Sequence, residues 1–248
     1  MSKGNFSRSQ LIEMCNEYLT DKNSELYKQS FITSCDTVKG ENEAERTEVI
    51  AEYICSRIND LERIRHLSRK NYKMSTHIGK ITNPDSNQGE KQLAKKLFNQ
   101  CKLLDGVHRT PYDFIGVIID YETPLKTSNS DKGVGKIDLL SVSDDSTNVY
   151  LLELKKEDSR ESMLRCVLEA YTYSKQVDDK MLKRSFNIPG NYAIKPTPLV
   201  SKNGAQWTEM QELKTGNKPH LKELMEKLKI AGPFYYELVD GKYVITDR

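Results

Sequence analysis

Hydrophobic positions before residue 80 recur at the three- and four-residue spacing of α-helices. One helix is predicted behind Ser9, a second amphipathic segment over 24–37, and a third from about 42 to 72. The first is predicted from Leu11, Ile12, Cys15 and Leu19. Strand-like alternation is almost absent here, so we predict a helical N-terminal region over residues 1–80.

The stretch at 81–90, ITNPDSNQGE, indicates a linker or turn, because Pro, Gly, Asn, Asp and Ser favour non-helical backbone. Residues 81–248 are therefore predicted to form a second domain. The pattern predicts helices at 88–103, 158–178 and 217–229, strands at 113–122, 135–143, 148–156 and 192–200, and a closing hairpin over 234–247. Asp240-Gly241 is a favourable hairpin turn. This order of elements predicts a mixed α/β fold.

The strand NVYLLELKK at 148–156 carries an acid and a base on one face. Side chains alternate across a strand, so Glu153 and Lys155 point the same way. The preceding strand contains Asp138, and the connection SVSDDSTN is short enough for a hairpin. If the two strands pair, Asp138 lies near Glu153 and Lys155.

Two converging carboxylates are costly unless a cation neutralises them. Oxygen ligands completed by water suit Mg²⁺ or Mn²⁺. An adjacent lysine can orient or help to deprotonate a metal-bound water and can stabilise developing negative charge. This combination is the minimal chemistry for hydrolysing a phosphodiester.

The region resembles the PD-(D/E)XK nuclease superfamily through Asp138 in GKIDLL and the triplet Glu153-Leu154-Lys155. The resemblance covers roughly 88–200 and implies a restriction-endonuclease-like mixed sheet flanked by helices. It also implies that Asp138, Glu153 and the Leu154 carbonyl hold the metal. Lys155 would then act on the nucleophilic water.

Two further features agree with this resemblance. Glu90 lies in the helix before the strands, where these nucleases often place another acidic ligand. Glu169 and Tyr173 are spaced like the Gln-x-x-x-Tyr motif of some branches, and Arg165 lies one turn before Glu169. The sequence departs from the family in having Ile137 where a proline often stands and glutamate at 169.

Each of these residues also has a structural interpretation. Glu153 and Lys155 would be an exposed cross-strand pair, and Glu90 would favour the positive end of a helix dipole. Arg165, Glu169 and Tyr173 would be a helix ion pair beside a core tyrosine. We predict a Mg²⁺- or Mn²⁺-dependent endonuclease or exonuclease acting on DNA or RNA. The alternative is a catalytically inactive nuclease-fold module that binds nucleic acid or a protein partner.

Composition adds little to this hypothesis. The 248 residues include 38 Lys and Arg against 36 Asp and Glu, a balance that neither indicates nor excludes a nucleic-acid partner. Residues 57–80, however, hold seven Lys and Arg against two acids. They form either one solvated helix face or a surface that follows phosphates.

The remaining signals concern location and assembly. No apolar run approaches the roughly 18 residues of a membrane span, and no apolar stretch follows the basic residues at the start. Five widely spaced cysteines without a C-x-x-C pair argue against a zinc ribbon and a disulfide framework. We expect a cytoplasmic protein with no membrane partner. The resemblance allows a homodimer, because many such nucleases cut two strands as dimers.

Overall fold

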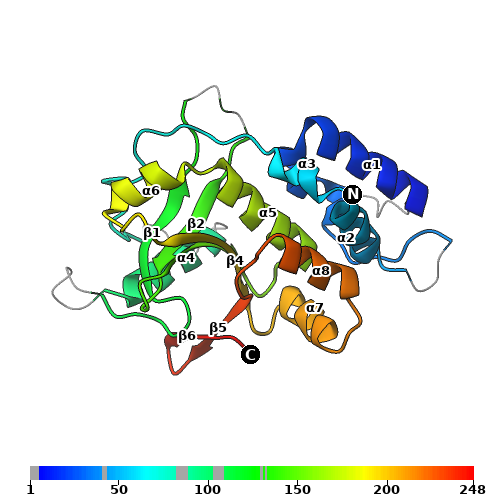
Figure 1. The fold of residues 1–248 in the computed structure, drawn as a ribbon. Helices are drawn as coiled ribbons and strands as arrows, with labels where there is room; N and C mark the ends of the chain where they lie inside the picture. Colours follow the sequence, from blue (N-terminus) through cyan, green and yellow to red (C-terminus); the bar gives the residue numbers. More distant parts are fainter. Residues whose placement is uncertain (1–5, 41–43, 82–88, 103–108, 129–130, 132) are drawn as a thin grey trace.

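A computed structural model describes residues 6–40, 44–81, 89–102, 109–128, 131 and 133–248. A six-stranded sheet lies on one side of the molecule, and most of the helices gather on the other (Figure 1). The linker predicted at 81–90 falls largely outside the described residues. In the described part of the chain, no helix is long and apolar enough to cross a membrane.

The strands follow one another in sequence order across the sheet. They are β1 (Val117–Pro124), β2 (Lys136–Val142), β3 (Asn148–Lys155), β4 (Ala193–Ser201), β5 (Phe234–Val239) and β6 (Lys242–Thr246). The pairs β1–β2, β2–β3 and β5–β6 are antiparallel, whereas β3–β4 and β4–β5 are parallel. The predicted mixed α/β fold is therefore confirmed.

Parallel neighbours need a long crossover, and helices supply it here. The β3–β4 crossover contains α5 (Met163–Gln176) and α6 (Asp179–Phe186). The β4–β5 crossover contains α7 (Ala205–Lys214) and α8 (Pro219–Lys227). We did not predict α6 and α7 from the sequence.

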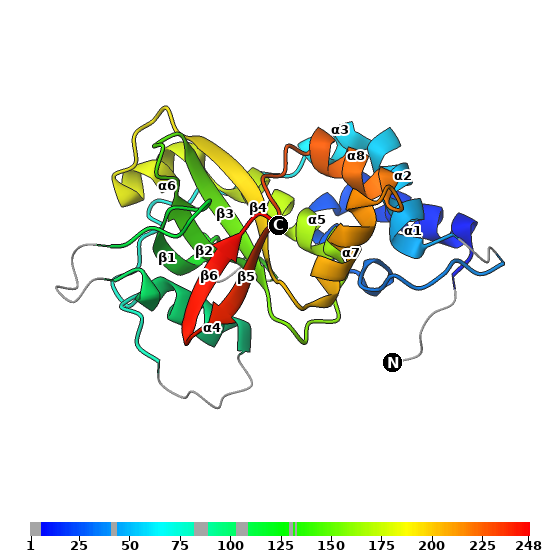
Figure 2. The same cartoon turned by 90° about the horizontal axis from the view of Figure 1, so that it is seen from below.

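Alternation along the strands gives each face of the sheet its own core. Leu139, Leu152 and Leu154 pack in one cluster with Leu97 and other residues of α4 (Gly89–Gln100). The next residues along the strands, Leu140 and Leu151 among them, pack instead in the cluster that includes α5. Figure 2 shows α4 below the sheet, α6 at its far edge, and α5 between the sheet and the group of α1, α2, α3, α7 and α8.

The N-terminal region is helical, but Ser7 rather than Ser9 caps its first helix, and the two later segments are broken into shorter elements. It contains α1 (Arg8–Asp21), α2 (Arg46–Ser56) and α3 (Ile58–Glu62), and the segment predicted over 24–37 forms two 3₁₀ helices, η1 (Asn23–Lys28) and η2 (Ser30–Ile32). The helix predicted to reach residue 72 is interrupted at Arg57, whose φ is −121° and ψ 26°, and ends at Glu62. Leu67 beyond it donates its N–H to the Gln176 carbonyl rather than to a preceding turn.

The strand predicted over 113–122 begins only at Val117 because a tight turn precedes it. Phe114 and Gly116 have φ values of 66° and 67°. Tyr112 and Gly116 also exchange backbone hydrogen bonds. A side chain at Gly116 would collide with the Val142 carbonyl oxygen, so only glycine fits there.

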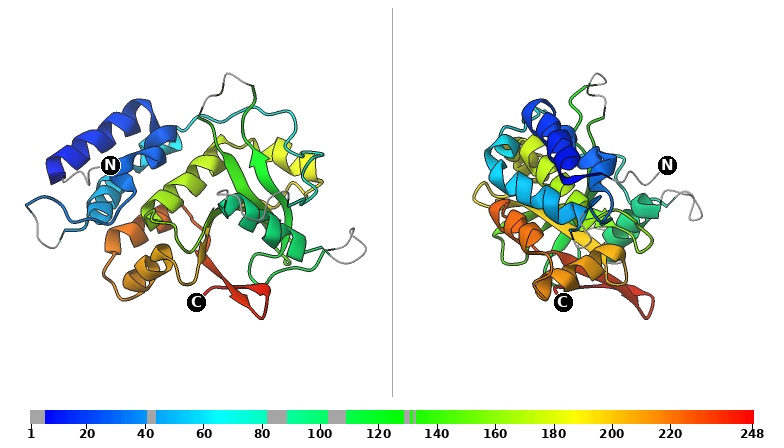
Figure 3. Two further views of the ribbon diagram at one scale, coloured as in Figure 1. Left: turned by 180° about the vertical axis from the view of Figure 1, so that it is seen from behind. Right: turned by 90° about the vertical axis from the view of Figure 1, so that its right-hand side faces the viewer.

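The hydrophobic core runs across residue 80. Buried residues of α1 and α2, such as Leu11 and Ile50, belong to the same cluster as Leu164 of α5 and Leu221 of α8. Glu48 of α2 accepts the backbone N–H groups of His220 and Leu221 at 2.9 Å each, at the start of α8. The two helices lie side by side in both views of Figure 3, so the N-terminal helices and α8 form one packed unit.

Candidate active site

Asp138 lies where β2 and β3 stop pairing. The ladder of paired residues ends at Leu139 and Leu152. Beyond it the Asp138 carboxylate replaces a main-chain partner, because its Oδ2 accepts the Leu154 N–H at 2.9 Å. This bond fixes the carboxylate beside the predicted triplet.

Glu153 and Lys155 form a buried ion pair. Both residues are only 4% exposed, and the Lys155 Nζ lies 2.7 Å from the Glu153 Oε1. The structure therefore contradicts the interpretation as an exposed cross-strand pair. Both side chains point to the α5 face of the sheet, as the alternation of the strand predicts.

Two more carboxylates reach the same ammonium group. The Lys155 Nζ lies 2.9 Å from the Glu161 Oε2 and 3.4 Å from the Glu169 Oε2. Glu169 comes from the middle of α5, whereas Glu161 comes from the loop just before this helix. Lys155 is thus held by three acids from three different segments.

The helix α5 holds the predicted supporting residues on the sheet-facing side. Its first turn is capped by Ser162, whose Oγ accepts the Arg165 N–H. The Tyr173 hydroxyl donates to the Glu169 Oε1 at 2.7 Å. Among the described residues, the Arg165 guanidinium pairs with Glu161 at 3.1 Å rather than with Glu169, so the ion pair suggested by the helical spacing is wrong.

Gly135, the glycine of the GKIDLL segment, leaves space for the Tyr173 side chain. A Cβ atom at Gly135 would lie 2.0 Å from the Tyr173 hydroxyl oxygen, which is impossible for real atoms. Absence of a side chain at 135 therefore lets the tyrosine reach Glu169.

Glu90 stands in the first turn of α4, on the far side of the strand end. Burial raises the pKa of Glu90, while nearby Lys155 and the backbone N–H of Lys156 act to lower it and Glu161 raises it. Glu90 therefore shares the electrostatic environment of the other predicted residues, although it belongs to a different helix.

The carboxyl groups of the site suppress one another's ionisation. Burial raises the pKa of Asp138 to about 8. Burial and the charges of Asp138 and Glu169 raise the pKa of Glu153 well above its usual value. Burial alone would lower the pKa of Lys155, but Glu153 and Glu169 outweigh it and hold that pKa well above its ordinary value.

The site thus contains more acids than bases. Five acidic side chains belong to it, and they face the cationic side chains of Lys155 and Arg165. The carboxylates are Glu90, Asp138, Glu153, Glu161 and Glu169. Oxygen donors suit a hard divalent cation such as Mg²⁺ or Mn²⁺, but in the described part of the chain no three of these five acids have ligand atoms within 4.8 Å of one another.

A hollow of about 430 Å³ is lined by chain neighbours of Glu90 and Lys155 rather than by these residues themselves. Gly89, Lys156 and Tyr236 are among its lining residues. The Tyr236 hydroxyl donates to the Lys155 carbonyl at 3.1 Å, which joins the wall of the hollow to the lysine of the site. None of the five acids of the site is among the residues that line this hollow.

Two residues that the sequence pattern did not predict, Glu161 and Tyr27, also belong to the site. Glu161 has no periodic signal, because it lies in a loop, although an acid just before a serine helix cap was visible in the sequence. The Tyr27 hydroxyl lies 3.3 Å from that of Tyr173, and the rings meet edge to face. Tyr27 comes from η1, and no sequence pattern links it to residues more than 100 positions away.

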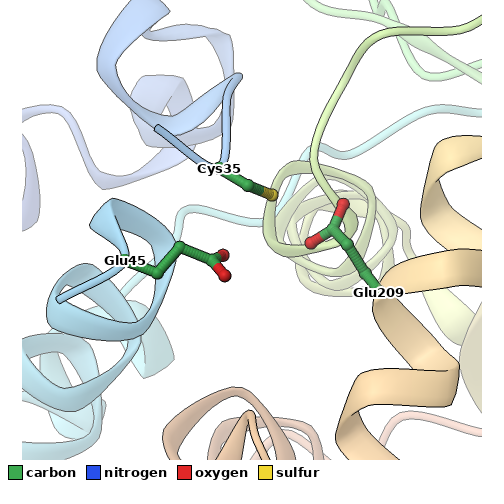
Figure 4. Close-up of side chains that lie close together, drawn as sticks. All are labelled: Cys35, Glu45 and Glu209. Atoms are coloured by element: carbon green, nitrogen blue, oxygen red, sulfur yellow. The ribbon is translucent and has the colours of Figure 1, made fainter. Parts of the chain in front are cut away.

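Outside the candidate active site, a second group of residues brings possible metal-ligating atoms close together. In the described part of the chain, one ligand atom each of Cys35, Glu45 and Glu209 lies within 4.8 Å of the others, and Figure 4 shows these side chains pointing to one centre. The ammonium of Lys218 already lies 2.5 Å from Glu45 and 3.5 Å from Glu209. A lysine therefore supplies the positive charge that this group needs.

Comparisons with models of protein families, with curated proteins and with solved structures found no match to the chain.

Proposed function

We propose that the chain is a metal-dependent nuclease that hydrolyses phosphodiester bonds of DNA or RNA on a restriction-endonuclease-like core. One observation carries the proposal. Asp138 sits on the Leu154 amide at the divergent ends of β2 and β3, beside the buried pair of Glu153 and Lys155. An acid from one strand thereby meets an acid and a lysine from the next.

Asp138, Glu153 and the Leu154 carbonyl would hold Mg²⁺ or Mn²⁺, with Glu90 as a further ligand. When bound, the cation would supply Lewis acidity toward water and phosphate oxygens. Lys155 would act as an ammonium that orients the water and neutralises charge developing on the phosphate. Glu161 and Glu169 would keep this ammonium in place, and Tyr173 would keep Glu169 in place.

Cleavage assays test the proposal. We expect the parent chain to cut at least one member of a panel of single- and double-stranded DNA and RNA in Mg²⁺ or Mn²⁺. Asp138→Ala and Lys155→Ala should abolish cleavage, because the first removes a proposed ligand and the second removes the ammonium that would orient the water. Asp145→Ala, in the exposed turn between β2 and β3, is the matched control and should cleave normally. Equal cleavage by Asp138→Ala and the parent would refute the proposal.

The second candidate is an inactive module of the same fold that binds nucleic acid or a protein partner. The observation in its favour is that Lys155 already neutralises Glu153, Glu161 and Glu169 within the described structure. Calorimetry with Mn²⁺ separates the two candidates. A working site should bind Mn²⁺, and Glu153→Gln should remove that binding. Absence of Mn²⁺ binding and of cleavage would favour the inactive module.

A further inference from the structure

A segment without acidic residues crosses the surface between α3 and α4. Residues 63–81, which we call the basic strap, form no helix or strand, and in Figure 1 they run from α3 past α6. They contain six Lys and Arg and no Asp or Glu. The six are Arg63, Arg65, Arg69, Lys70, Lys73 and Lys80.

The basic strap is fixed by tertiary contacts rather than by regular structure. The Leu67 N–H donates to the Gln176 carbonyl at 2.7 Å. Tyr72 is fully buried, its N–H donates to the Ser185 Oγ at 3.0 Å, and its hydroxyl accepts the Asp178 N–H at 2.8 Å. The path of the chain between these points is therefore determined.

Its far end is also anchored. The His77 Nδ1 lies 2.8 Å from the Asp120 Oδ1, and the imidazole stacks on the ring of Tyr121. The Gly79 N–H donates to the Tyr121 hydroxyl at 3.0 Å. The backbone that carries the cationic residues between these contacts is consequently held in place.

The neighbouring helix adds positive charge. The strap and residues 178–186 together carry nine Lys and Arg against two Asp, whereas the whole chain has 38 against 36. The rest of the chain is therefore net acidic, and positive charge concentrates on this surface. Such a surface attracts polyanions.

Two cations of this surface face one hollow. It has a volume of about 480 Å³, and its lining includes Lys70 from the strap and Arg184 from α6, with Asn71 beside them. Both cationic residues are exposed. Among the described carboxylates, none forms an ion pair with Lys70, Lys73 or Arg184. A phosphate group fits the chemistry of this hollow.

Two other cationic residues of the strap, Arg63 and Arg69, bind groups within the protein. Arg63 lies 3.2 Å from the Asp60 carboxylate. Arg69 donates to the Asn71 and Lys126 carbonyls and so ties the strap to the segment after β1. Lys70, Lys73 and Arg184 remain for a ligand.

The strap starts close to the candidate active site. Leu67 contacts Gln176, which lies seven residues after Glu169 on α5, or about 10 Å along the helix axis. At about 3.4 Å of axial rise per nucleotide of one strand, that is roughly three nucleotides.

We propose that the basic strap and α6 form a phosphate-binding surface for the backbone of a nucleic acid that extends from the candidate active site. The proposal depends on the proposed function only for its choice of nucleic acid as the polyanion. Contacts to phosphates from lysine and arginine carry no base specificity, so this surface would set affinity and not sequence preference.

Binding measured without cleavage tests it. Fluorescence anisotropy of labelled single-stranded and duplex DNA and RNA would be recorded in EDTA from low to high salt. The variant Lys70→Gln/Lys73→Gln/Arg184→Gln should bind at least ten-fold more weakly at low salt. Its slope of log affinity against log salt should fall by about 2 to 3, because each phosphate contact contributes roughly 0.7 to 0.9. The control Lys39→Gln/Lys222→Gln/Lys242→Gln removes the same charge from exposed positions elsewhere and should change affinity less than two-fold.

Equal affinity and equal slope for the two triple variants would overturn the proposal. So would loss of binding to phosphatidylserine vesicles by the strap variant with nucleic-acid binding unchanged, since the surface would then serve a membrane. Weakened binding by the strap variant, in a parent chain that never cleaves, would support this surface while refuting the nuclease. Cleavage by the parent with unaltered binding by the strap variant would support the nuclease and refute this surface.

Discussion

At the residue scale, the site depends on the balance between burial and charge. The Asp138 carboxyl group accepts one hydrogen bond from the Leu154 backbone N–H. Burial favours its neutral form, and Lys155 is the main compensating cation. A divalent cation would reverse this preference, because it stabilises ionised carboxylates. The protonation of Asp138 is therefore the property that should respond most clearly to metal.

The pH dependence of stability should reveal this residue. The pKa of Asp138 is raised to about 8 from 3.8, so between pH 4 and 8 the folded chain keeps a proton that the unfolded chain has released. Stability should accordingly fall as pH rises through this range. Asp138→Asn, which keeps an acceptor for the Leu154 N–H, should gain stability relative to the parent as the pH rises from 4 to 8, measured by urea unfolding.

Added Mn²⁺ provides the control for that prediction. It should stabilise the parent at pH 8 and have little effect on Asp138→Asn. If both proteins show the same dependence on pH, Asp138 is not the group responsible.

At the element scale, α5 connects the site to the N-terminal region. Ser162 caps the helix, and its own hydroxyl donates to the Ile32 carbonyl. Arg165 in the first turn also donates to the Thr33 hydroxyl at 3.2 Å. The start of α5, and with it Glu161, is thus positioned by η2 and the residue after it.

Ser162→Ala should lower the free energy of unfolding by about 1 to 2 kcal/mol, because it removes the cap and the bond to Ile32. It should also reduce cleavage, since Glu161 would lose its support. Ser174→Ala is the control within the same helix, because its hydroxyl bonds only to the Tyr171 carbonyl in the described structure. Chemical denaturation and cleavage rates measure both effects, and equal stabilities of the two variants would contradict the role of the cap.

At the scale of the whole molecule, the shared core and the Glu48 cap on α8 argue that the chain unfolds as one unit. Removal of residues 1–80 would expose the buried faces of α5 and α8. We expect the truncated chain to lose its cooperative thermal transition in circular dichroism, with the full chain showing a single one. A sharp transition in the truncated chain would show instead that residues 81–248 fold alone.

The fold could be predicted from sequence where local patterns decide the structure. Alternation in 135–143 and 148–156 identified β2 and β3 and placed Glu153 and Lys155 on one face. It failed where tertiary contacts override local preference. Beyond Glu62 the chain leaves the helix because its backbone bonds go to α5 and its Tyr72 is buried against α6.

The candidate site divides in the same way. Asp138, Glu153 and Lys155 lie on adjacent strands, so hairpin pairing was enough to bring them together. Glu161 and Tyr27 reach the site through loop and 3₁₀ geometry, for which the sequence has no period. The helix α7 was missed because Gly204 gives it no side-chain cap and its apolar residues form no clear stripe.

The contact between Gly135 and Tyr173 has an evolutionary consequence. Since the tyrosine hydroxyl occupies the space of a side chain at 135, neither position can change freely. In any descendants of a common ancestor, a larger residue at 135 should occur only with a shorter one at 173. Covariation of these two positions would therefore mark chains that build their site in the same way.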